Sequence, residues 1–198
     1  MNESHTKLHL ITLLPIVFQK CYETIKDFVL KLFNLCLKSS IYLESWKQAT
    51  AIVIQKNNKK DPNDYKSYRP ISLLSIIGKW FSKIISKRLT WESDQQDWIN
   101  PKQFGFRKNS SCEDALLRMS NIANKAIAEK KFCLVISLDI SGAFDCAWHP
   151  GILDSLINVG CSPSYIKLMN NFLSNRTVKI NVQEKSASKT LTKSCPQG

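Results

Sequence analysis

The chain begins with apolar side chains at helical spacing and continues with shorter extended and helical runs. Between residues 15 and 38, apolar positions recur mostly every three or four residues, which predicts a helix. Residues 48–56 (QATAIVIQK) are short and β-branched, so they predict a strand. The polar stretch 57–70, with its two prolines, predicts a loop. Residues 76–89 predict an amphipathic helix, because apolar side chains share one face and basic side chains the other.

Two further helices are predicted from their starts. Ser111 and Asp114 have the spacing of a capping box, a weaker form of the usual pairing with Glu or Gln, and helical periodicity follows them. Ser162 and Pro163 mark a second start, because proline suits the first helical position. That second helix is expected to end near Leu173.

The remaining apolar runs predict strands. Residues 132–138 are apolar on both faces, so we expect a strand that lies centrally in a sheet. Residues 177–182 and 189–194 are expected to pair around a turn at 183–188. The combined pattern predicts an α+β fold in which helices pack on a small, mainly antiparallel sheet.

Composition and charge narrow the class of protein. The 198 residues are 43% hydrophobic and 22% charged, which is typical of a globular protein and excludes a disordered one. The net charge of +12 favours a polyanionic partner, with a basic membrane-binding surface as the rival explanation. Nine of the basic residues fall between Ala51 and Leu89, where only two acids oppose them. This stretch is either a phosphate-contacting surface or a solvated face.

The cysteines and the N-terminus argue against a zinc or redox site, a membrane-spanning segment and a signal peptide. None of the seven cysteines has the C-x-x-C spacing of zinc or redox sites, and their number is odd. We therefore expect reduced, mostly buried thiols in an intracellular protein. The apolar N-terminal stretch is too short to span a bilayer and lacks a signal-peptide cleavage site, so no membrane association is expected.

Two carboxylates stand out in residues 137–149, SLDISGAFDCAWH. Asp139 directly follows the apolar run 132–138, where a buried carboxylate is costly unless something compensates its charge. A divalent metal could do so, with Asp139 and the backbone carbonyl of Ile140 as ligands. Aspartate also commonly caps the turn after a strand, and spacing alone leaves both interpretations open.

Several blocks together resemble one family. SLDISGAFDCAWH is similar to the first palm motif of reverse transcriptases from non-LTR (LINE-type) retrotransposons, especially the jockey-like group. SYRPISLLSIIGKWFSKIISKRL resembles the fingers signature of that family, and INPKQFGFRKNSSCEDALLRM resembles its next block. LSNRTVKINV and the terminal SCPQG occur in the family's order and spacing. The resemblance covers roughly residues 46–198 and implies an RNA-directed DNA polymerase of right-hand architecture.

The resemblance assigns the first of the two carboxylates to catalysis. Asp139 matches the metal-binding aspartate of the polymerase palm, with the carbonyl of Ile140 as a second ligand. The implied cofactor is Mg²⁺, with two ions in the complete enzyme, and the implied reaction is a two-metal nucleotidyl transfer. Asp145 is expected to brace the loop, and Trp148 and His149 are expected to be structural.

Further positions carry over as nucleotide-binding residues. Phe144 matches an aromatic that lies beneath the sugar and would reject a ribose 2′-hydroxyl; core packing is the alternative interpretation, and the two are compatible. Arg69 matches a fingers arginine that pairs with the triphosphate, for which a guanidinium is suited. Lys56 is assigned the same role, with Lys59 and Lys60 as rivals. The full nucleotide-binding set comprises Lys56, Arg69, Ala143, Phe144, Gln197 and Gly198.

The block QFGFR is expected near the template strand. Gln103 and Arg107 are the predicted template-binding residues, with Arg107 on phosphate. Phe104 and Phe106 either stack on bases or pack internally. The implied partners are an RNA template, a DNA primer and dNTPs, and the implied location is the nucleus, with assembly on RNA in the cytoplasm beforehand.

The resemblance also predicts a domain division. We expect residues 1–45 to be a helical entry region and residues 46–198 to be fingers and an incomplete palm. The family's Tyr/Phe-Ala-Asp-Asp motif would follow Gly198, so we expect this polypeptide alone to be inactive as a polymerase. The alternatives are a non-catalytic nucleic-acid-binding fragment and a decayed or domesticated transposon remnant.

Overall fold

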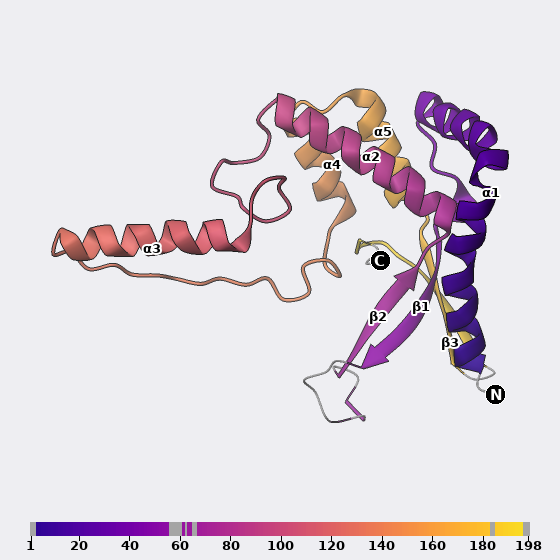
Figure 1. The fold of residues 1–198 in the computed structure, drawn as a ribbon, viewed down its shortest axis with the longest axis horizontal. Helices are drawn as coiled ribbons and strands as arrows, with labels where there is room; N and C mark the ends of the chain where they lie inside the picture. The colour runs from indigo at the N-terminus through magenta and orange to yellow at the C-terminus, as the bar shows by residue number, and fades with distance from the viewer. Residues whose placement is uncertain (1–2, 56–60, 62, 65–66, 183–184, 196–198) are drawn as a thin grey trace. The chain divides into compact units, whose positions relative to one another are not determined.

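The computed structural model describes residues 3–55, 61, 63–64, 67–182 and 185–195 (Figure 1). The chain divides into two compact units. The first comprises Met1–Leu89 together with Gly142–Gly198, and the second comprises Thr90–Ser141. None of the described helices is long and apolar enough to traverse a lipid bilayer.

The first unit contains a four-stranded sheet in the order β2-β1-β3-β4. Its strands are β1 (Gln48–Gln55), β2 (Tyr68–Leu73), β3 (Thr177–Val182) and β4 (Lys185–Thr190). The β1–β2 and β3–β4 pairs are antiparallel, whereas β1 and β3 are parallel. The predicted α+β class with a mainly antiparallel sheet is therefore confirmed.

Two strand boundaries differ from the sequence prediction. The predicted loop 57–70 gives its last three residues to β2, where Pro70 lies opposite Val53. Proline has no N–H to donate, but β2 is an edge strand, where that loss is tolerated. The predicted strand 189–194 instead runs from Lys185 to Thr190. Its sequence KSASKT is fully exposed, so pairing with β3 forms this strand without a hydrophobic signal.

The helices of the first unit follow the predicted periodicity closely. They are α1 (Glu3–Ser39), the short 3-10 helix η1 (Glu44–Trp46), α2 (Ile76–Gln95), α4 (His149–Asn158) and α5 (Pro163–Leu173). The predicted helices 15–38, 76–89 and 163–173 are all present, although α1 and α2 extend further, and α2 ends in the second unit. Helix α4 was not predicted; its second residue is a proline, which the first turn tolerates.

An aromatic core joins α1, η1, α2 and α5. Phe33 of α1 lies 5.2 Å from Phe81 of α2 and 6.1 Å from Trp46, measured between ring centroids. Tyr42, which is fully buried, donates its hydroxyl to the carbonyl of Gly78 at 3.1 Å. Burial also raises the pKa of the Cys36 thiol in this core. Residues before and after position 45 thus share one core, while a separate functional role for residues 1–45 stays a prediction.

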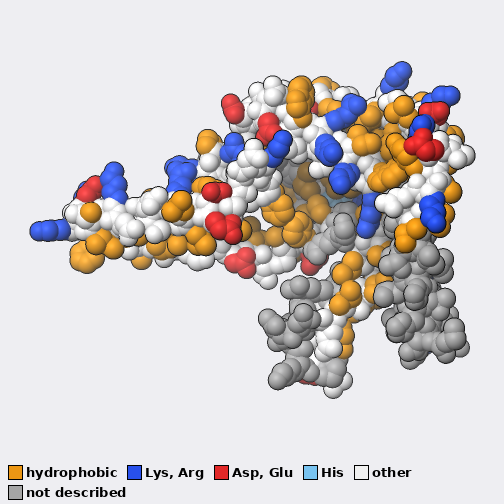
Figure 2. Space-filling model, in the orientation of Figure 1, with side chains coloured by type: hydrophobic (Ala, Val, Ile, Leu, Met, Phe, Trp, Pro, Cys, Tyr) orange, Lys and Arg blue, Asp and Glu red, His pale blue; other side chains and the backbone are white. Residues whose placement is uncertain are grey.

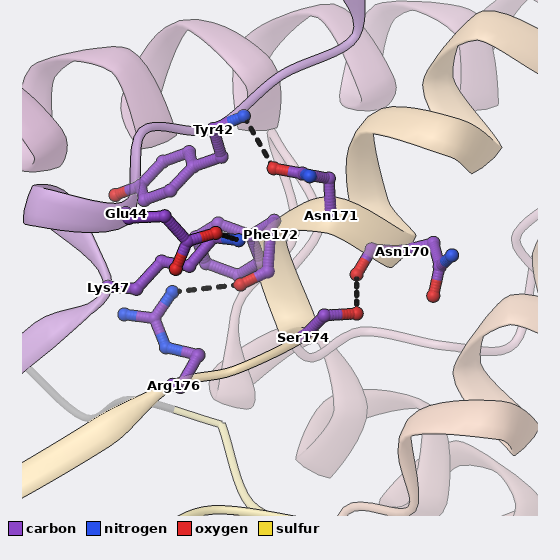
Figure 3. A network of polar contacts seen from close by, with 8 residues as sticks. All are labelled: Tyr42, Glu44, Lys47, Asn170, Asn171, Phe172, Ser174 and Arg176. Atoms are coloured by element: carbon purple, nitrogen blue, oxygen red, sulfur yellow. Dashed lines mark hydrogen bonds and ion pairs between the residues drawn. The ribbon is translucent and has the colours of Figure 1, made fainter.

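A partly buried network of polar contacts lies at the corner where β1 and β3 begin (Figure 3). The backbone N–H of Tyr42 donates to Oδ1 of Asn171 at 2.7 Å. Lys47, only 1% exposed, pairs with Glu44 at 2.6 Å and directly precedes β1. Arg176, also 1% exposed, directly precedes β3. Because Gln48 pairs with Thr177, these two buried cations stand at the starts of neighbouring parallel strands.

The second unit contains the end of α2, a loop and helix α3 (Cys112–Ala128). The predicted capping box is present, since Ser111 and Asp114 exchange side chain-to-backbone hydrogen bonds. The predicted strand 132–138 is wrong: this segment has no regular structure, and Leu138 is 91% exposed. An apolar run becomes a strand only with partner backbone, and no strand of the described residues pairs with it.

Candidate functional site

Two loop segments that are distant in sequence are joined by backbone hydrogen bonds in the first unit. The N–H of Cys195 donates to the carbonyl of Phe144 at 2.9 Å. The N–H of Ser194 donates to the carbonyl of Ala147 at 2.8 Å. The ring Nε2–H of His149 donates to the carbonyl of Ser194 at 2.8 Å. Hydrogen bonds therefore join residues 144–149 and 193–195 into one element, which we call the loop clamp.

A cavity of about 360 Å³ lies beside the loop clamp. Strands β1 and β3 contribute Ala49, Ala51, Thr177 and Val178 to its wall, and the segment from Lys189 to Cys195 closes another side. Its charged lining consists of Asp145 and three basic residues, Arg176, Lys189 and Lys193. The excess of positive charge and the small β1 side chains suit this cavity to an anionic ligand.

Arg176 is buried in the cavity wall, whereas Lys189 and Lys193 are exposed. Its guanidinium donates from Nη1 to the carbonyl of Phe172 at 3.0 Å and lies 4.6 Å from the centroid of that ring. Burial lowers the pKa of Arg176. Nη2 is buried and has no hydrogen-bond partner among the described residues. Burial likewise raises the pKa of the Cys195 thiol, and the guanidinium of Arg176 opposes that rise.

The predicted nucleotide-binding residues are described to different extents. Ala143 and Phe144 lie in an exposed turn at the start of the loop clamp, with Phe144 half exposed. Arg69 lies in β2 with its backbone opposite Ile54, and its side chain is outside the described part. Lys56, Gln197 and Gly198 lie outside the described residues. The carbonyl of Phe144 thus accepts a hydrogen bond from Cys195, the residue that directly precedes the Pro-Gln-Gly sequence.

The predicted metal ligands belong to the second unit. Asp139 and Ile140 lie in the irregular segment after α3, and both are exposed. In the part of the chain that the structure describes, no three His, Cys, Asp or Glu side chains gather closely enough to hold a metal ion. One carboxylate and one carbonyl supply too few ligands for two Mg²⁺ ions. The described residues therefore do not fit the two-ion site that the resemblance implies.

The predicted template-binding residues form a compact loop in the second unit. The carbonyl of Asn100 accepts the N–H of Gln103 at 2.9 Å and Nη1 of Arg107 at 3.4 Å. Phe104 is partly buried and lines a groove with residues of α3, whereas Phe106 is 94% exposed. Of the two predicted alternatives, internal packing therefore agrees with the partial burial of Phe104 but not with the exposure of Phe106. Other apolar side chains lie along the surface of α3 (Figure 2).

Sequence reasoning missed two features of the first unit. Arg176 lies in the motif LSNRTVKINV, but the sequence analysis did not predict that it is buried. The pattern that could have indicated its burial is a single arginine between the end of a helix and the start of a strand. Ser194 has a φ of +94°, a conformation that favours glycine. No local sequence pattern predicts that conformation, and both hydrogen bonds of the Ser194 backbone go to the distant residues 147 and 149.

Comparison with known proteins adds an independent result. The model of a protein family described as "Reverse transcriptase (RNA-dependent DNA polymerase)" matches residues 54–198. An RNA-directed DNA polymerase from mobile element jockey of Drosophila melanogaster is 36% identical over 173 residues, which are 87% of this chain and 19% of that protein. Its counterpart from Drosophila funebris is 31% identical over 172 residues, 86% of this chain and 19% of that protein. The chain thus spans about a fifth of the length of these curated relatives.

Proposed function

The chain belongs to the reverse transcriptase (RNA-dependent DNA polymerase) family, and from this premise we propose that it forms the fingers and part of the palm of an RNA-directed DNA polymerase from a non-LTR retrotransposon. The observation that carries the proposal is the family match over residues 54–198. This range contains all five motifs on which the resemblance was based. The 36% identity with the jockey polymerase supports the non-LTR group.

The proposed substrates are an RNA template, a DNA primer and dNTPs. The anion-suited cavity beside the loop clamp supports a nucleotide site that includes Phe144 and the Pro-Gln-Gly sequence. Arg69 and Lys56 are proposed to bind the triphosphate, and Gln103 and Arg107 the template. The net charge of +12 supports the nucleic-acid partners.

Reverse transcriptases generally use divalent metal ions. We propose Asp139 and the Ile140 carbonyl as Mg²⁺ ligands of the complete enzyme, which would bind two ions. The described residues supply no cluster of three side-chain ligands for such ions. We also propose a nuclear location preceded by assembly on RNA in the cytoplasm, which imaging of the tagged chain in host cells would test.

A primer–template binding assay tests the partner proposal. The purified chain is titrated into a fluorescently labelled RNA template annealed to a DNA primer, and anisotropy is followed between about 50 and 200 mM salt. The logarithm of the affinity should fall linearly with the logarithm of salt, with a slope of about −0.9 per phosphate contact. Arg69→Ala should weaken binding on every template sequence, whereas Lys26→Ala, on a residue paired with Glu23 of α1, serves as the control.

Primer extension with dNTPs and Mg²⁺ separates the competing functions. Binding with extension would show that this chain polymerises by itself. Binding without extension is the expected result, and it is shared by a piece of a larger polymerase and by a non-catalytic binding protein. The two are separated by joining this chain to the remaining palm and thumb of a related polymerase. Primer extension by the joined protein would identify this chain as a piece of a larger polymerase. A chain that binds no primer–template would refute the proposed partners and favour a remnant without this activity.

A further inference from the structure

We propose that His149 is a positioning residue that holds Ser194 and Cys195 against Phe144 of the proposed nucleotide site, through the strained backbone of Ser194. The inference rests on the proposed nucleotide site but concerns residues that the site itself does not include. It starts from one contact between segments 45 positions apart, the 2.8 Å hydrogen bond from Nε2 of His149 to the carbonyl of Ser194.

The backbone of Ser194 is held in a conformation that it would not adopt alone. Its φ of +94° places the Cβ against the backbone, a strain that only glycine avoids. Such a conformation persists only where surrounding contacts determine it. Here the contacts lie on both sides of the residue: the N–H of Ser194 donates to Ala147, and its carbonyl accepts from His149.

Further backbone contacts lie on either side of Ser194 in the described part of the segment. Upstream, the N–H of Leu191 donates to the carbonyl of Arg176 at 2.8 Å, at the end of the β3–β4 hairpin. Lys193 forms an isolated bridge with Trp148. Downstream, the N–H of Cys195 donates to Phe144, the residue proposed to lie beneath the nucleotide sugar. Ser194, which His149 contacts, therefore directly precedes the residue that is hydrogen-bonded to Phe144.

Position within α4 explains why a histidine can do this. His149 is the first residue of α4, so the helix fixes its backbone. Its ring extends beyond the helix start to the carbonyl of Ser194. The ring Nε2–H reaches the carbonyl whether the imidazole is neutral or protonated, because both forms can donate from Nε2. Loss of the donor leaves the strain of Ser194 unopposed on its carbonyl side, and the segment should relax toward negative φ.

Amide hydrogen exchange tests the positioning role directly in this chain. His149→Phe keeps a ring but removes the donor, and the amides of Ser194 and Cys195 should then exchange about tenfold faster. His149→Gln places an amide N–H near the position of Nε2 and should restore slow exchange. The amide of Ile152, which donates to the carbonyl of Trp148 within α4, should be unchanged in both variants. Ser155→Ala, which removes a hydrogen bond internal to α4, should leave Ser194 and Cys195 unaffected.

Nucleotide binding tests the functional consequence. The affinities for dATP and ATP are measured by calorimetry with Mg²⁺, and the wild type should prefer dATP. His149→Phe should reduce that preference about tenfold, and His149→Gln should retain it, which loss of ring packing would not explain. If His149→Phe does not fold, His149→Asn supplies a donor too short to reach Ser194.

Each result decides a distinct part of the inference. Unchanged exchange at Ser194 and Cys195 in the donor-free variants would overturn the positioning role. Faster exchange with an unchanged dATP preference would show that the contact does not shape the nucleotide site, and would overturn the inference as well. A wild-type chain that binds neither nucleotide would refute the nucleotide site for this chain, and the role of His149 in it, while exchange would still decide whether the contact orders Ser194.

Discussion

Replacing Phe33 by alanine should destabilise the first unit strongly, because Phe33 joins α1 to the core of the sheet-containing unit. Its side chain is 6% exposed, and its ring contacts the rings of Phe81 and Trp46. Truncating a buried phenylalanine costs about 3–5 kcal/mol, which includes the cavity left behind. Two aromatic pairs place the expected loss near the middle of that range, about 4 kcal/mol.

Urea unfolding followed by tryptophan fluorescence measures this loss, since Trp46 is buried beside the substituted position. The midpoint should fall by roughly 2 M if the unfolding slope is about 2 kcal/mol per molar urea. Phe28→Ala is the matched control, because Phe28 lies on the same helix but is 68% exposed. Its effect should stay within about 0.5 kcal/mol. Equal effects of the two substitutions would refute the packing of α1 described above.

The same core makes the predicted boundary at residue 45 testable. A chain that begins at Trp46 lacks the buried side chains of Val29, Phe33, Cys36 and Tyr42. Burying one such apolar side chain contributes roughly 1.5–3 kcal/mol, and a domain's total stability is about 5–15 kcal/mol. The shortened chain should therefore lack a cooperative unfolding transition. A cooperative transition like that of the full chain would show that residues 46–198 fold independently.

Three local features give further expected outcomes. Gly78→Ala should cost about 1–2 kcal/mol on urea unfolding, because the new Cβ would lie 2.9 Å from the Cβ of a buried tryptophan; Gly105→Ala, with nothing within 4 Å, should be neutral. Ser111→Ala should destabilise α3 by about 1 kcal/mol, measured by amide exchange in its first turn, and an unchanged rate would refute the capping box. Cys36 should react with thiol reagents more slowly than exposed Cys112, because burial raises its pKa; equal rates would contradict its burial.

The elements predicted correctly from sequence are those whose own residues supply the signal. The apolar faces of α2 and α5 and the capping box of α3 are local, and each was placed within a few residues. β4 was displaced because its sequence KSASKT has no buried face to reveal it. The run 132–138 was predicted as a strand from its hydrophobicity, but a strand also needs partner backbone, about which the run itself carries no information.

The candidate site divides in the same way. Phe144 and Arg69 could be proposed from motifs because their side-chain chemistry is written in the sequence. The strain at Ser194 and the orphaned Nη2 of Arg176 could not, since each is a property of contacts between distant segments. Sequence motifs therefore indicate the residues that would contact a nucleotide, but not the residues that position those contacts.

The first unit suggests where the precision of such a site resides. Phe144, which is proposed to contact the nucleotide sugar, lies in an exposed turn and is half exposed, so side-chain packing alone would hold it only loosely. Its carbonyl instead accepts a hydrogen bond from the N–H of Cys195, and the ring of His149 contacts Ser194, the strained residue directly before Cys195. Substitutions other than proline leave the backbone N–H and C=O groups in place, so positioning that depends on them tolerates sequence change in the loops. His149 is the exception, because it contributes a side chain to an otherwise main-chain element. The position of Phe144 should therefore be more sensitive to replacement of His149 than to replacement of the neighbours that contribute only backbone groups.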